Sequence, residues 1–121
     1  MKKILVVDDD RLMVDFITEC LKRGSYLVET AFDGASGLAK ARVFQPDLMV
    51  LDLMMPDMHG FDVCETMRRE PGFAGVKILI SSGKAYEVDK KAAKRLGADE
   101  YIVKPFSVEQ LLTTVKTLLS A

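Results

Sequence analysis

Short apolar runs alternate with segments of helical periodicity five times along this chain of 121 residues. The runs have the length of buried strands, and between them apolar residues recur at the spacing of an amphipathic helix. This alternation predicts right-handed crossovers and a parallel sheet covered by helices on both faces. Five units cannot close an eight-stranded barrel, so the sheet should be open and doubly wound. The expected strands cover residues 3–7, 27–31, 48–51, 76–81 and 101–103.

Turn and cap signals bound the expected helices. Asp33 is an N-cap candidate for the second helix, residues 107–110 form a capping-box pattern, and Gly97 is a C-cap candidate for the fourth. The apolar residues expected to face inward are Met13, Phe16, Ile17, Cys20 and Leu21 in the first helix, Ala35, Leu38, Ala39 and Val43 in the second, Val63, Cys64 and Met67 in the third, Val88, Ala92, Ala93 and Leu96 in the fourth, and Val108, Leu111, Leu112, Val115 and Leu119 in the last.

Length and composition narrow the class of protein. The length predicts one domain over residues 1–121. The chain has 17 basic and 18 acidic residues, so no net field favours direct contact with nucleic acid or an anionic membrane. No apolar stretch approaches the roughly 20 residues of a membrane span. Cys20 and Cys64 lack metal-ligand spacing and are expected to be buried free thiols, which favours a cytoplasmic protein.

Polar residues stand at the ends of four expected strands. Asp8 and Asp9 follow the first strand, Asp52 the third, Ser82 the fourth and Lys104 the last. In a parallel sheet these carboxyl ends form one rim, where such folds bind ligands. At about 5 Å and an effective dielectric constant near 20, each pair of carboxylates repels by roughly 3 kcal/mol. The crowding therefore predicts a site for a divalent metal ion and a phosphoryl group.

Five ordered motifs carry a family resemblance: VDD at 7–9, LDLMMPDMHG at 51–60, SG at 82–83, GADEY at 97–101 and KPF at 104–106. Together they resemble the receiver domain of bacterial response regulators, similar to the single-domain chemotaxis-type regulators, over almost the whole chain. The resemblance implies a flavodoxin-like, doubly wound, five-stranded parallel sheet in the order 2-1-3-4-5, with five helices.

The resemblance also implies the chemistry of the site. Asp52 stands where the family carries the phosphoacceptor, which receives a phosphoryl group from a sensor histidine kinase or phosphotransfer protein. Asp9 and Asp52 would bind Mg²⁺ directly and Asp8 through a water molecule, and the backbone carbonyl of Met54 would complete the protein ligands. Lys104 would pair with Asp52 at rest and bind phosphoryl oxygens afterwards.

Two further positions match the switch of this family. Ser82 would donate its hydroxyl to the phosphoryl group, and Tyr101 would turn inward when that hydroxyl moves. The family signals through its fourth helix, last strand and last helix. On that fourth helix Lys90, Lys91, Lys94 and Arg95 form a basic patch, which is either a docking surface or a solvated face. The peptide bond between Lys104 and Pro105 is a cis candidate.

Other interpretations and several details stay open. A phosphatase or phosphotransferase with an aspartyl nucleophile would need a second acid two residues after Asp52, where Met54 stands, and a substrate cap. A flavin-type cofactor carrier would need a phosphate-binding loop after the first strand, where the acidic triplet would repel phosphate. A phosphorylation-independent interaction module shares the fold. The downstream target or fused output domain, the phosphoryl lifetime, and whether the protein is a monomer or a phosphorylation-dependent dimer are undetermined.

Overall fold

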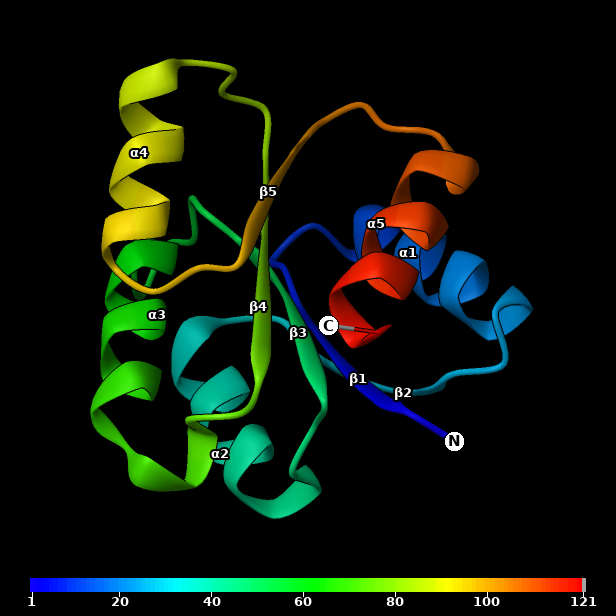
Figure 1. Cartoon of the computed structure of the whole chain (residues 1–121), viewed down its shortest axis with the longest axis horizontal. Helices are drawn as coiled ribbons and strands as arrows, with labels where there is room; N and C mark the ends of the chain where they lie inside the picture. Colours follow the sequence, from blue (N-terminus) through cyan, green and yellow to red (C-terminus); the bar gives the residue numbers. More distant parts are fainter. Residues whose placement is uncertain (121) are drawn as a thin grey trace.

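The computed structural model describes residues 1–120, and Ala121, the last residue of the predicted domain, lies outside the described part. Five strands form one sheet in the order β2-β1-β3-β4-β5, and every neighbouring pair is parallel (Figure 1). This confirms the predicted fold, with β4 displaced by one residue so that Ser82 ends it. The strands are β1 Lys3–Val7, β2 Leu27–Ala31, β3 Leu48–Asp52, β4 Lys77–Ser82 and β5 Glu100–Val103.

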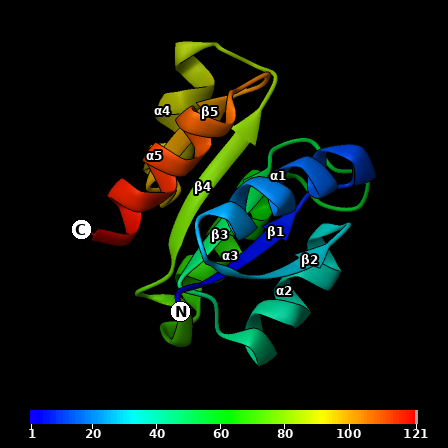
Figure 2. The ribbon, with the colours of Figure 1, turned by 90° about the vertical axis from the view of Figure 1, so that its right-hand side faces the viewer.

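Helices cover both faces of the sheet. Figures 1 and 2 show α1 and α5 on one face and α2, α3 and α4 on the other. The helices are α1 Arg11–Arg23, α2 Gly34–Phe44, α3 Gly60–Arg69, α4 Glu87–Arg95 and α5 Val108–Ser120, with a short 3₁₀ turn at Pro71–Phe73. In residues 1–120 we find no helix with the length and apolar character needed to span a bilayer.

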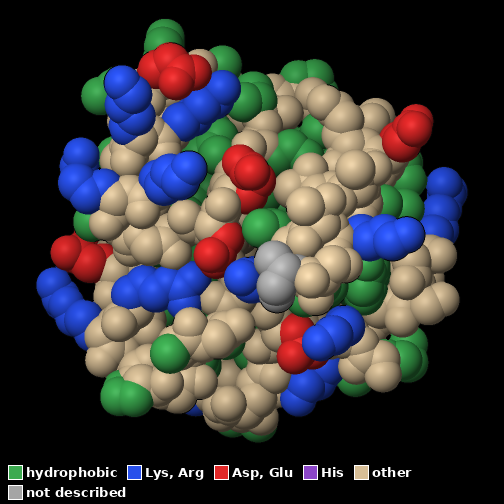
Figure 3. Space-filling view, in the orientation of Figure 1, with side chains coloured by type: hydrophobic (Ala, Val, Ile, Leu, Met, Phe, Trp, Pro, Cys, Tyr) green, Lys and Arg blue, Asp and Glu red, His purple; other side chains and the backbone are tan. Residues whose placement is uncertain are grey.

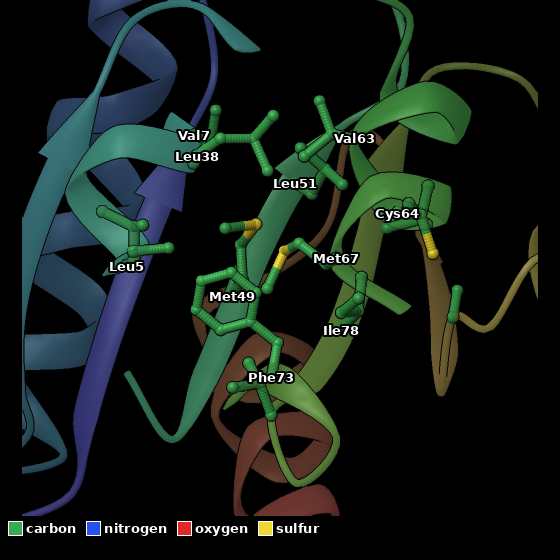
Figure 4. Close-up of a cluster of buried hydrophobic side chains, with 14 of the residues drawn as sticks. Leu5, Val7, Leu38, Met49, Leu51, Val63, Cys64, Met67, Phe73 and Ile78 are labelled. Atoms are coloured by element: carbon green, nitrogen blue, oxygen red, sulfur yellow. The ribbon is translucent and has the colours of Figure 1, made fainter. Parts of the chain in front are cut away.

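Two apolar cores lie on either side of the sheet, because side chains alternate between its faces. In β3, Leu48 and Val50 belong to the core under α1 and α5, whereas Met49 and Leu51 belong to the core under α2, α3 and α4 (Figure 4). The cysteines are both free and buried, as expected. This alternation decides toward which face each residue at a strand end projects.

The predicted caps are present. The Asp33 carboxylate accepts a hydrogen bond of 2.7 Å from Ser36 N–H at the start of α2. At α5, Gln110 N–H donates to the Ser107 hydroxyl and Ser107 N–H donates to the Gln110 amide oxygen, which is a capping box. Gly97 follows the cap residue of α4 with φ of 106°, a conformation that favours glycine.

The predicted inward face of α2 is wrong in three positions. Ala35, Ala39 and Val43 point to solvent, and the Val43 side chain is 87% exposed. The buried face combines Leu38 with small residues, because a Cβ at Gly37 would lie only 2.9 Å from the methyl groups of a core valine in β1. Small residues allow this helix to lie close to the sheet. The positions of its apolar residues alone therefore do not predict its buried face.

Single positions in α1 and α4 also differ from the prediction. In α1, Val14 is buried and Phe16 is 39% exposed, with its ring 6.0 Å from that of Phe106. In α4, Val88 is 73% exposed and Ala93 is the buried residue. This helix lies at the sheet edge beside β5, a strand of only four residues, which leaves the first turn of α4 with little to pack against.

The assignment of the α2 faces predicts different costs for two truncations. Leu38→Ala should lower the free energy of unfolding by about 2–5 kcal/mol, because it removes buried volume. Val43→Ala should change it by no more than about 0.5 kcal/mol, because the side chain is exposed. Urea denaturation of both variants measures these values. Equal losses would contradict the observed orientation of the helix.

Candidate functional site

The three acidic residues predicted at the strand ends converge at the carboxyl edge of the sheet. One carboxylate oxygen each of Asp8, Asp9 and Asp52 lies within 4.8 Å of the other two. Asp8 and Asp52 are buried, with 1% and 7% of their surface exposed, while Asp9 is exposed. The buried pair comes from neighbouring central strands, and the exposed member leaves the cluster open to solvent. Such a group of oxygen donors could hold a metal ion.

Lys104 bridges the two buried carboxylates. Its ammonium nitrogen lies 3.0 Å from Asp8 Oδ2 and 3.1 Å from Asp52 Oδ1. The lysine directly follows β5, and the peptide bond to Pro105 is cis, in line with the sequence-based candidate. One cation therefore opposes three carboxylates in this cluster, and the site keeps an excess of negative charge.

The pKa values of Asp52 and Lys104 are both raised, for different reasons. The pKa of Asp52 is raised from an ordinary 3.8 to about 6, mainly by desolvation and next by the charge of Asp8, although Lys104 lowers it. Burial alone would lower the pKa of Lys104, but its hydrogen bonds and charge contacts with both carboxylates outweigh burial and raise it. At neutral pH Asp52 is ionised, and its negative charge is only partly compensated by Lys104.

The loop from β3 to α3 is held close to this edge. Gly60 N–H donates a 2.7 Å hydrogen bond to the Leu53 carbonyl, and a Cβ at Gly60 would lie 2.5 Å from the Asp52 carbonyl oxygen. Only glycine fits that approach. Met54, two residues after Asp52 in this loop, is 53% exposed.

Comparison with known proteins identifies the family. Residues 4–116 match the model of the response regulator receiver domain. The chain belongs to the response regulator receiver family. It is 40% identical over 119 residues to the DNA-binding dual master transcriptional regulator RpaA of Synechocystis sp., and 42% identical over 118 residues to the alkaline phosphatase synthesis transcriptional regulatory protein PhoP of Bacillus subtilis. These alignments cover 98% of this chain but 49% and 48% of the relatives, so the chain spans about half their length.

Solved structures agree with this assignment. The chemotaxis protein CheY4 of Vibrio cholerae superposes with a TM-score of 0.93 at 34% identity, covering 98% of each chain. A CheY-like receiver domain protein of Methanospirillum hungatei gives 0.92 at 32% identity, covering 99% of this chain and 94% of its own.

In this receiver the two predicted switch residues are both hydrogen-bonded to the backbone of one residue, Lys84. The buried Ser82 hydroxyl accepts a 3.1 Å hydrogen bond from Lys84 N–H, and the Tyr101 hydroxyl donates a 2.9 Å bond to the Lys84 carbonyl. Lys84 thus ties the end of β4 to β5 through its backbone. Ser82 is not hydrogen-bonded to Asp52, and its side chain lies on the Tyr101 side of the sheet.

The basic patch of the receiver lies along α4, where Figure 3 shows lysine and arginine side chains gathered beside acidic ones. A groove of about 320 Å³ runs between α4 and β5. Its lining includes Lys90, Lys91 and Lys94 together with Glu87 and Glu100. The groove therefore carries side chains of both charges.

Two positioning contacts are not among the predictions from the sequence. Asp10 caps α1 by accepting from the N–H groups of Leu12 and Met13. Asp57, in the loop after β3, accepts from the N–H groups of Gly34 and Ala35, each at 3.0 Å, and thereby fastens this loop to the start of α2. An aspartate before an apolar periodic segment signals the first contact. The second spans more than twenty residues and has no local signal.

The raised pKa of Asp52 predicts a pH-dependent cost in the metal-free protein. A carboxyl whose pKa is higher in the folded state is destabilising when ionised, so the cost is absent below about pH 4 and complete above about pH 6. Asp52→Asn should therefore raise the free energy of unfolding by roughly 2–3 kcal/mol at pH 7.5. The gain should disappear near pH 4.

Urea denaturation in a chelating buffer across this pH range measures the gain. Asp62→Asn, at an exposed position in the first turn of α3, is the matched control. A loss of stability in the Asp52 variant at pH 7.5 would contradict the electrostatic description of the cluster.

Proposed function

We propose that residues 1–121 form a single receiver domain that acts as a phosphorylation-controlled switch of a two-component system. Asp52 accepts a phosphoryl group from a sensor histidine kinase or phosphotransfer protein. The observation that carries this proposal is the geometry of Asp52, which is buried beside two further carboxylates and hydrogen-bonded through one oxygen to Lys104. Family membership and the order of the motifs point the same way.

The donor set fits Mg²⁺. All candidate ligands are oxygen atoms, as hard divalent cations prefer, and the exposure of Asp9 leaves room for the water ligands that Mg²⁺ retains. We assign Asp9, Asp52 and the Met54 carbonyl as direct ligands and Asp8 as a ligand through water. When bound, the ion neutralises charge on the carboxylates and on the transferring phosphoryl group.

The transfer itself needs little covalent assistance. Asp52 Oδ1 is held by Lys104, and no hydrogen bond from the described residues occupies Oδ2, so this oxygen is free to attack phosphorus. A phosphorus–oxygen bond forms as the phosphorus–nitrogen bond to the donor imidazole breaks, and the imidazole nitrogen keeps the electron pair. The Lys104 ammonium then neutralises a phosphoryl oxygen. Hydrolysis restores the carboxylate, so the protein consumes no external substrate beyond its phosphoryl donor.

The proposed output starts at the backbone of Lys84. We propose that the Ser82 hydroxyl turns away from Lys84 N–H when it donates to a phosphoryl oxygen, and that this releases the loop after β4. The Tyr101 hydroxyl loses its fixed carbonyl partner in the same movement. We propose that this rearranges the surface formed by α4, β5 and α5, and that a downstream protein or a fused output domain recognises the change. Residues 54 and 84 flank the reacting group and are proposed to tune its lifetime.

Metal binding should stabilise the folded protein. At Mg²⁺ ten times its dissociation constant, the free energy of unfolding should rise by about 1.4 kcal/mol. Asp9→Asn should lose most of this gain, whereas Asp62→Asn should retain it. Thermal unfolding with and without Mg²⁺ tests both variants. An unchanged melting temperature for the wild type at saturating Mg²⁺ would exclude the proposed ion.

Phosphorylation at one residue is the direct test of the function. Incubation with Mg²⁺ and a small acyl phosphate should add one phosphoryl group to the wild type and none to Asp52→Asn, as measured by intact-protein mass. Asp62→Asn should be modified like the wild type. Modification of the Asp52 variant, or none of the wild type with either the acyl phosphate or a phosphorylated histidine kinase, would refute the proposal.

A further inference from the structure

Ser81, the residue before the predicted switch serine, faces the phosphoacceptor. Its Cα is the register partner of Asp52 Cα across the β3–β4 pair, and the Leu53 N–H donates to the Ser81 carbonyl at 3.3 Å. Parallel strands are about 5 Å apart, and paired residues project to the same face. Ser81 therefore lies directly beside Asp52, on the side of Asp52 opposite to Asp8.

The alternation of β4 separates the two neighbouring serines. Leu79 belongs to the core under α1 and α5, and Ile80 to the opposite core. Ser81 consequently shares the face of Leu79 and of the carboxylate cluster, whereas Ser82 shares the face of Ile80 and Tyr101. Two adjacent hydroxyl groups thus project to opposite sides of the sheet.

The Ser81 hydroxyl is buried without a hydrogen-bond partner. Only 1% of the residue is exposed, and its Oγ is one of two buried side-chain oxygen atoms within residues 1–120 that lack a partner. Lys104 follows β5 and its ammonium reaches Asp52 at the end of β3, so its side chain passes the end of β4, which lies between these two strands. An unpaired buried hydroxyl is costly and requires an explanation, and for Ser81 its place beside Asp52 offers one.

We propose that Ser81 is a reserve hydrogen-bond donor to the carboxyl oxygen of Asp52 once this residue is phosphorylated. The inference rests on the proposed function of Asp52. At rest Lys104 donates to Asp52 Oδ1. When the ammonium moves to a phosphoryl oxygen, Oδ1 becomes the carbonyl oxygen of an acyl phosphate. The assigned Mg²⁺ would take one of its two lone pairs, and the lone pair that Lys104 occupied is left without a donor. The Ser81 hydroxyl is beside it on the same face and replaces that hydrogen bond by rotating about χ1.

The position of the donor determines its effect on the phosphoryl lifetime. In hydrolysis, water attacks phosphorus, the phosphorus–oxygen bond to Asp52 breaks, and the electron pair returns to the carboxylate. Negative charge grows on the carboxyl group in the transition state, so a donor there stabilises the transition state more than the acyl phosphate. Ser81 should therefore accelerate loss of the phosphoryl group, by about threefold to tenfold for one hydrogen bond.

Four substitutions at one position separate the hydroxyl from side-chain volume. Ser81→Ala removes the hydroxyl. Ser81→Val and Ser81→Thr introduce side chains of nearly equal volume, of which only threonine carries a hydroxyl. After phosphorylation with acyl phosphate and removal of the donor, intact mass over time should show a lifetime about three to ten times longer in Ser81→Ala than in the wild type, and likewise in Ser81→Val than in Ser81→Thr. Ser81→Cys, a weaker donor, should fall between Ser81→Ala and the wild type. Thr18→Val, which removes the other unpartnered hydroxyl, should decay like the wild type.

A spectroscopic readout distinguishes donation from packing. The acyl-phosphate carbonyl stretch of ¹³C-aspartate-labelled protein should shift to higher frequency in Ser81→Ala, because the hydrogen bond that weakens this bond is lost. The metal-free, unphosphorylated Ser81→Ala variant should be at least as stable as the wild type, since no bond is removed there. Equal lifetimes and an unshifted carbonyl band in a phosphorylated Ser81→Ala protein would overturn the role of Ser81 and leave Asp52 as phosphoacceptor. A wild type that is never phosphorylated would overturn both.

Discussion

The repulsion among carboxylates buried at one edge of the sheet is the constraint on which the rest of this molecule depends. Asp8 and Asp52 leave water because they end strands that are packed on both faces. A single lysine bridges them, and the exposed Asp9 adds a third charge that this bridge does not meet. The lysine thus allows the protein to fold with these carboxylates together, but it neutralises their negative charge only in part. Such a site is electrostatically suited to bind a cation and then to accept a phosphoryl group.

The sheet order and most of the site follow from local patterns in the chain. Strand length, helical periodicity and the polar residue at each strand end are short-range signals, and they are sufficient to predict that Asp8, Asp9, Asp52 and Lys104 lie together at one rim of the sheet. The buried face of α2 is not predictable in this way. It consists largely of small residues, which allow the helix to lie close to the sheet. Contacts such as that of Asp57 with the start of α2 depend on the assembled tertiary structure and leave no periodic trace.

The alternation of side chains in β4 divides two chemical tasks between neighbouring residues. Ser82 shares the face of Tyr101, and both are hydrogen-bonded to the backbone of Lys84, which suits the proposed role of Ser82 in reporting a change at the site to the surface near α4 and β5. Ser81 is the register partner of Asp52, the proposed phosphoacceptor, and shares its face. Two adjacent serines look like one polar feature in the sequence. In a strand, however, their side chains project to opposite faces of the sheet.

Unfavourable features of the resting protein concentrate at this same edge. The raised pKa of Asp52 and the unpaired hydroxyl of Ser81 are both costs of the unphosphorylated, metal-free state. At the opposite end of the sheet, the Arg68 guanidinium donates to three backbone carbonyls and to Asp99, which in turn accepts from Ile78 N–H. A scaffold satisfied at one end and strained at the other confines rearrangement to the strained end. Under the proposed function, charge neutralisation there would relieve these costs locally, and the free energy released would be available to move the loop at Lys84 while the sheet remains intact.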